Sequence, residues 1–99
     1  MSFPFLNNNL PDESLSLDSL LVRNKASTFF MRVDRDFESE NIRAGDILIV
    51  DRSLKPVKSS IVVGIVNGDF VLLRVSCAYK IKFPFIVWGV VTYVIRKVS

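Results

Sequence analysis

Charged side chains crowd one short stretch of this sequence, and such a cluster could do acid–base chemistry. Residues 32–51, RVDRDFESENIRAGDILIVD, contain nine charged residues between two apolar runs, with Phe37 in the middle. A stretch of this kind is either an active-site loop or only the solvated turn between two strands. The choice between them depends on the other residues that could take part in catalysis. It also depends on the strands and turns that would position those residues.

Several kinds of catalytic site are excluded by composition. The chain contains no histidine, and Cys77 is its single cysteine. A zinc site, a Cys–His or Ser–His catalytic pair and an internal disulfide therefore cannot be built. Cys77 is interpreted as a small apolar filler rather than a reactive thiol, because no histidine or cationic helix terminus is at hand to lower its pKa. No metal site and no cofactor are predicted.

The pattern of the chain predicts a small, mainly β domain. The 99 residues suit one domain, and 49% of them are hydrophobic, enough to bury a core. Six runs are rich in β-branched and aromatic residues and are bounded by turn residues, as expected of strands. They cover 27–33, 46–51, 60–66, 69–75, 78–82 and 85–98. We expect several coiled, non-parallel sheets.

Local signals refine this organisation. Asn67-Gly68 lies between two strand-like runs and predicts a type I′ hairpin turn, and Ala44-Gly45-Asp46 predicts a tight turn before the next strand. Residues 14–22 offer Ser16 or Asp18 as an N-cap, which suits one short helix. We therefore divide the chain into an extended arm with a short helical turn, 1–26, and a β domain, 27–99.

Charge and hydropathy indicate the kind of partner. Residues 1–51 carry five basic and nine acidic side chains, net −4, whereas residues 52–99 carry eight basic side chains against Asp69, net +7. These cations are scattered, which does not favour direct nucleic-acid binding. The longest apolar run, 85–95, is about half of the roughly 20 residues that a membrane helix needs. Without a signal peptide pattern either, we expect a cytoplasmic protein.

Four segments together resemble one known family. STFFMRV, IRAGDILIVDRSL, SSIVVGIVNGDFVLLRV and VWGVVTYVIRKV are similar to the C-terminal domain of the LexA and UmuD proteins, the self-cleaving serine–lysine peptidases. The UmuD branch is the most similar, and SFPF and LSLDSLLV near the start resemble the segment that follows its cleavage point. The resemblance implies a LexA/signal-peptidase-like fold.

The same resemblance places both catalytic positions, and both are changed. The family's nucleophilic serine falls on Phe37, and its lysine base falls on Leu73. Shifting the alignment does not restore the pair, because Arg74 stays protonated and points away from Leu73 on a strand. Ser39 with Lys55 or Lys58 is the remaining alternative pair. We expect a pseudo-peptidase in which apolar packing of Phe37 fills the former site.

The implied function is that of a ready-made, UmuD′-like accessory subunit, because the chain starts where the processed form of its relatives starts. Such a subunit dimerises and binds a UmuC-like Y-family polymerase in SOS-induced translesion synthesis, with RecA filament as a further partner. The C-terminal strand is expected to be an edge strand that pairs across a two-fold axis, the alternative being a central strand. The dimer contacts expected on it are Trp88, Val90, Val91 and Tyr93.

Three other functions stay open on the sequence alone. An active self-cleaving peptidase requires a different alignment of the loop. A LexA-like repressor requires a helix-turn-helix domain, which these 99 residues lack. A regulator that forms mixed dimers with an intact paralogue would use the same surfaces as the accessory subunit.

Overall fold

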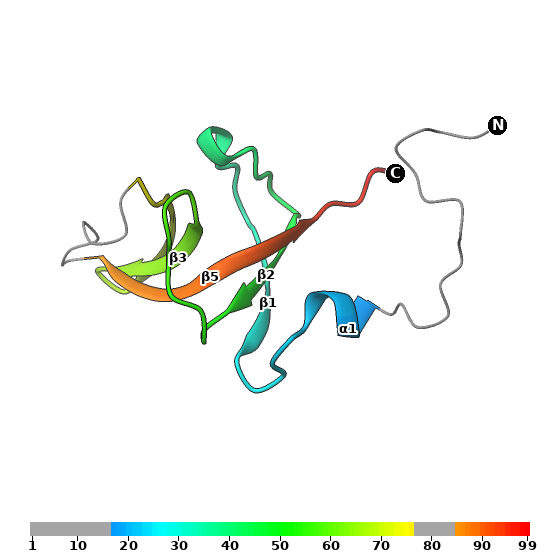
Figure 1. Cartoon of the computed structure of the whole chain (residues 1–99). Coiled ribbons are helices and arrows are strands. Elements are labelled where there is room, and N and C mark those ends of the chain that lie inside the picture. The colour runs from blue at the N-terminus through cyan, green and yellow to red at the C-terminus, as the bar shows by residue number, and fades with distance from the viewer. Residues whose placement is uncertain (1–16, 77–84) are drawn as a thin grey trace.

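The computed structural model describes residues 17–76 and 85–99 (Figure 1). It confirms the mainly β class, with one short α-helix. The predicted strand at 78–82 and Cys77 lie outside the described residues. The elements are α1 (Leu17–Leu21), β1 (Thr28–Arg32), a 3-10 turn (Glu38–Glu40), β2 (Ile47–Asp51), β3 (Ile61–Val66), β4 (Asp69–Arg74) and β5 (Ile86–Ile95).

The described strands form one sheet, where several were expected. Its order is β1-β2-β5-β3-β4, and every neighbouring pair is antiparallel. The register shifts at Ile49/Val50 in the β2–β5 ladder and at Val63/Gly64 in the β3–β5 ladder. Shifts of this kind bend a strand and increase its twist, so a single sheet can coil around its own core.

Strand β5 is central, so the prediction that it is an edge strand is wrong. Figure 1 shows it as the longest strand, and it pairs with β3 over 86–91 and with β2 over 90–95. This explains its two apolar faces. Val90 is buried, Trp88 and Val91 are half-buried, and Tyr93 is 42% exposed. The dimer contacts at these four residues stay a prediction, and Tyr93 is the only one of them with an exposed side chain.

Both predicted turns are confirmed. Asn67 and Gly68 have φ values of 51° and 83°, as a type I′ hairpin turn requires, and Gly45 has a φ of 92°. The core lies on the two sides of β5. One cluster is built on Val33, Ile42, Leu48, Val50 and Val63, and a second on Val62, Val75 and Val90.

The Trp88 ring packs against aromatic side chains on both edge strands of the described sheet. Its ring lies 5.3 Å from that of Phe29 on β1 and 5.6 Å from that of Phe70 on β4, measured between centroids. The guanidinium of Arg52 lies 4.5 Å above the indole, and its Nε donates a hydrogen bond to the Trp88 carbonyl at 2.9 Å. Strands β1 and β4, the two edges of the described sheet, are thereby brought to the same side of the molecule.

Candidate functional site

The charged stretch between β1 and β2 is a folded loop. Its backbone closes on itself through paired hydrogen bonds between Phe37 and Ile42, 2.7 Å and 3.2 Å long, around the 3-10 turn. Asn41 ends this turn in the left-handed conformation, with a φ of 54°. The Val33 amide donates to the Asp46 carbonyl and the Gly45 amide to the Val33 carbonyl, so the loop is also fixed at its base. We call residues 34–45 the pocket loop.

A buried carboxylate anchors the second half of this loop. Asp46 is 2% exposed, and both of its oxygens accept hydrogen bonds from Arg96, at 2.9 Å and 2.7 Å. Its Oδ2 also accepts the Arg43 amide at 2.9 Å. The bonds from Arg96, followed by that from Arg43, lower the pKa of Asp46 to about 2. Asp46 is therefore an anion over the physiological pH range, and its role is structural.

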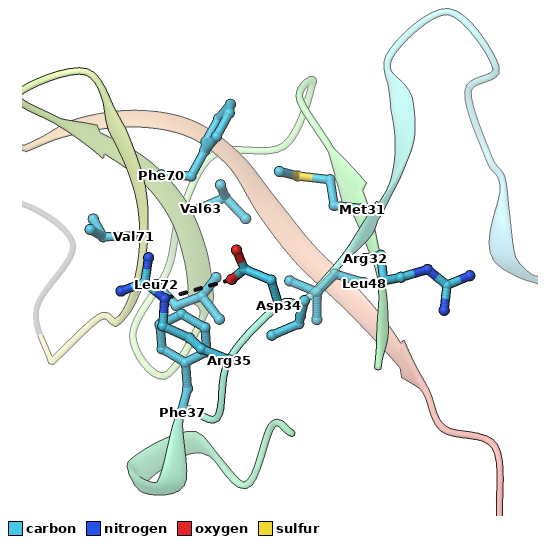
Figure 2. Close-up of a pocket in the computed structure, with 11 residues that line it drawn as sticks. Met31, Arg32, Asp34, Arg35, Phe37, Leu48, Val63, Phe70, Val71 and Leu72 are labelled. Carbon is cyan, nitrogen blue, oxygen red and sulfur yellow. Dashed lines mark ion pairs between the residues drawn. The ribbon is translucent and has the colours of Figure 1, made fainter. Parts of the chain in front are cut away.

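A small hollow of about 80 Å³ lies beside the pocket loop, between the two edge strands (Figure 2). Met31 and Arg32 line it from β1, and Phe70, Val71 and Leu72 line it from β4. Leu48 and Val63 contribute the floor from the core, and the pocket loop with Val33 supplies the remaining lining residues, Asp34, Arg35 and Phe37. The dashed line in Figure 2 marks the ion pair from Arg35 Nε to Asp34 Oδ1, 3.6 Å long.

Phe37, which the resemblance assigns to the family's nucleophile position, lines this pocket. It is half-buried and packs against the core cluster that includes Val63, and the Arg35 guanidinium lies 5.9 Å from its ring centre. Leu72 lines the same pocket and packs against the same cluster. Leu73, which the resemblance assigns to the family's lysine position, is 39% exposed and is absent from the lining. The pocket therefore brings Phe37 together with Leu72 rather than with Leu73.

Arg74 ties the 3-10 turn to the hairpin. Its Nε donates to Glu40 Oε2 at 2.6 Å, and its Nη1 donates to the Ser59 carbonyl at 3.1 Å. The Arg74 side chain is 48% exposed, whereas that of Glu40 is 11% exposed. The sequence showed that Arg74 cannot act as a base, and here it serves as an anchor for the pocket loop.

The alternative nucleophile lies outside the pocket. Ser39 is exposed on the 3-10 turn, and its hydroxyl donates to the neighbouring Glu40 carboxylate at 3.3 Å. Lys55 and Lys58 are exposed in the connection between β2 and β3. Within residues 17–76 and 85–99, the pocket is lined by no serine, cysteine or lysine. Arg32, Asp34 and Arg35 are the ionisable groups of this described lining, and none of them is a nucleophile for acyl transfer.

Two structural contacts were missed by the sequence reasoning. One is the Asp46–Arg96 pair, whose partners are fifty positions apart. The other is Asp51, a buried carboxylate that accepts hydrogen bonds from Ser53 and Ser27. The bonds from Ser53, and then that from Ser27, lower its pKa. Only the residue types gave a signal, because an acidic residue beside an apolar strand needs a partner once it is buried.

Two kinds of feature are absent from the described part of the chain. No group of three or more acidic, cysteine or histidine side chains there is placed to hold a metal ion. No helix among the same residues has the length and apolar character needed to cross a membrane.

Comparison with known proteins places the chain in a family. No family model matches it. SamA of Salmonella typhimurium strain LT2 is 31% identical over 109 residues, which cover 96% of this chain and 78% of SamA. MucA of Escherichia coli is 31% identical over 109 residues, 92% of this chain and 75% of MucA. ImpA of Shigella flexneri is 28% identical over 111 residues, 96% and 77% of the two chains. The chain belongs to the UmuD family, which is involved in SOS mutagenesis.

Proposed function

We propose that this protein is a catalytically inactive, UmuD′-like accessory subunit. In this role it dimerises and binds a UmuC-like Y-family polymerase in translesion synthesis. The peptidase fold then serves as a binding module. The observation that carries the proposal is the apolar lining that Phe37 and Leu72 give the pocket, Phe37 being the residue that the resemblance assigns to the family's nucleophile position.

The chemistry of the pocket supports the loss of activity. Serine–lysine catalysis needs a hydroxyl beside a lysine that is desolvated enough to lose its proton near neutral pH. Phe37 offers no hydroxyl, and Leu72, which lines the same pocket, offers no amine. A lysine introduced at Leu73 would share that side chain's 39% exposure and would stay protonated in water.

The well-ordered second half of the stretch between β1 and β2 is compatible with a binding role. The turn at Gly45 and the strand β2 are fully built, with Asp46 and Asp51 satisfied by hydrogen bonds. A stable scaffold with a filled active site suits a subunit that acts by contact.

Association with a polymerase tests the proposal directly. We expect the full chain, coexpressed with a tagged UmuC-like polymerase from the same organism, to elute with it in size-exclusion chromatography. An intact UmuD-family protein serves as the positive control. No complex under conditions where that control binds would contradict the accessory role.

Dimerisation is tested separately by light scattering at micromolar concentration. A mass of two chains is expected for the wild type. Tyr93→Glu should reduce it, because Tyr93 is the exposed member of the four predicted contacts. A monomeric wild type would contradict the dimer.

A further inference from the structure

The residue that directly follows β5 is hydrogen-bonded to the pocket loop, although the two lie far apart in the sequence. Arg96 is the first residue after β5, and it makes three hydrogen bonds to the segment that follows the 3-10 turn. Two go to the carboxylate of Asp46, and the third runs from Nη2 to the carbonyl of Asn41 at 2.8 Å. One guanidinium therefore joins both ends of the stretch 41–46.

The contact between Arg96 and Asp46 is more buried than the contact between Arg74 and Glu40, which also anchors the loop. The side chains of Arg96 and Asp46 are 33% and 2% exposed, against 48% and 11% for Arg74 and Glu40. A bidentate pair with one buried partner is stronger than a surface ion pair, and removing the cation leaves a buried charge uncompensated. The bond to the Asn41 carbonyl adds a third point of attachment, at a residue whose left-handed backbone Asn tolerates well.

The pocket depends on this segment. Asp46 is bonded through its carbonyl to Val33, and Ile42 is bonded through its backbone to Phe37. Val33 and Phe37 both line the pocket, together with Asp34 and Arg35 between them. The hydrogen bonds of Arg96 are thus connected to the pocket wall in two places, through the backbone bond between Asp46 and Val33 and through the backbone bonds between Ile42 and Phe37.

We propose that Arg96 is a latch that couples the C-terminal end of β5 to the pocket loop and so fixes the shape of the pocket. Arg96 is a positioning residue that acts through Asp46 and Asn41. Local opening of the loop, rather than unfolding of the sheet, is the event that the latch opposes. A change in the position of the chain just beyond β5 would then change the shape of the pocket. A change in the shape of the pocket would in turn shift the position of Arg96.

Native-state hydrogen exchange of Arg96→Gln in the full chain tests the latch. The amides of Val33, Phe37, Ile42 and Gly45 report on it, because all four are hydrogen-bonded within or at the base of the loop. We expect their exchange to accelerate by at least about tenfold, in line with the loss of hydrogen bonds to a charged group. The ladder amides of the β3–β4 hairpin should accelerate by less than about threefold.

Two further variants separate a latch from a general loss of stability. Val62→Ala removes side-chain volume from the second core cluster, which contains no pocket-loop residue, and should accelerate the loop amides no more than those of the hairpin. Arg96→Lys keeps the charge but cannot form the bidentate pair, so it should give an intermediate acceleration confined to the loop, and it replaces Arg96→Gln if that variant does not fold. Equal acceleration of loop and hairpin amides in the Arg96 variants, or no acceleration at all, would overturn the proposal.

Discussion

The two halves of the stretch between β1 and the end of β2 differ in burial, and with it in their freedom to change. In residues 34–40, Phe37 and Glu40 are half-buried and the other side chains are exposed. In residues 42–51, Ile42, Asp46 and every residue from Leu48 to Asp51 are buried. The difference shows that the half that could carry the nucleophile lies at the surface, whereas the half that builds the scaffold is fixed by packing. Catalytic residues can be lost from such a loop without loss of the fold.

The largest effect is expected from the buried half. Ile42 is 1% exposed and belongs to the main core cluster. We expect Ile42→Ala to lower the free energy of unfolding by about 2–5 kcal/mol, measured by urea denaturation. Glu38→Ala, in the exposed half, should change it by less than about 0.5 kcal/mol. Similar losses for the two variants would remove the contrast between the halves.

The buried half should also make the free energy of unfolding depend on pH in the acid range. A carboxyl whose pKa is lower in the folded state stabilises the protein above its unfolded pKa, and this contribution is lost as the pH falls through the folded value. For Asp46 these values are 3.8 and about 2. The free energy of unfolding of the wild type should therefore fall from about pH 4 to pH 2. The Asp46→Asn variant should be less stable than the wild type at pH 7, and its free energy of unfolding should depend less on pH over this range. An unchanged slope in the variant would show that other carboxyls account for the acid sensitivity.

An intermediate effect is expected at Phe37. Because its ring is half-buried, Phe37→Ala should lower the free energy of unfolding by about 1–2 kcal/mol, while Phe37→Leu should lower it by less. Thermal unfolding followed by circular dichroism measures both. A Phe37→Ala variant as stable as the wild type would mean that the ring does not fill the former site.

The smallest effect is expected for the anchor at the surface. Glu40→Gln should lower the free energy of unfolding by about 0.2–1 kcal/mol, because the Arg74 side chain is 48% exposed and an ion pair with one partner open to water contributes little. The loss should shrink further in 1 M salt, which screens exposed charges. An effect as large as that of Asp46→Asn would place the main anchor of the loop on β4.

Local sequence signals predicted the elements but not their long-range contacts. The strands from β1 to β4 and the turn at Asn67-Gly68 follow from residue types within a few positions of one another. The Asp46–Arg96 pair has no local signature, because its partners meet only after β5 has paired with β2. The order of the strands could not be inferred either, since apolar residues on both faces of β5 suit a central strand as well as an edge strand in a dimer.

Of the two candidate site positions, one lines the pocket and the other does not, and their catalytic assignment stays a prediction. The alignment with the family led to Phe37, which lines the pocket, and to Leu73, which does not. The choice between Leu72 and Leu73 depends on which face of β4 turns toward the loop, and this is set by the coiling of the whole sheet. The alternation of side chains along a strand gives two faces but does not say which of them meets the loop.

Intact-mass spectrometry can show whether the chain has lost self-cleavage, as we propose. The full chain is incubated with activated RecA filament and with a UmuD-family protein whose own nucleophilic serine is replaced by alanine, so that cutting of a bond in that second protein is also seen. An intact UmuD-family protein is the positive control. We predict that the masses of the chain and of the substituted protein both stay unchanged while the control is cut. A discrete cleavage product that disappears in Ser39→Ala would contradict the account, because it would show that Ser39, and not the position of Phe37, supplies a working nucleophile.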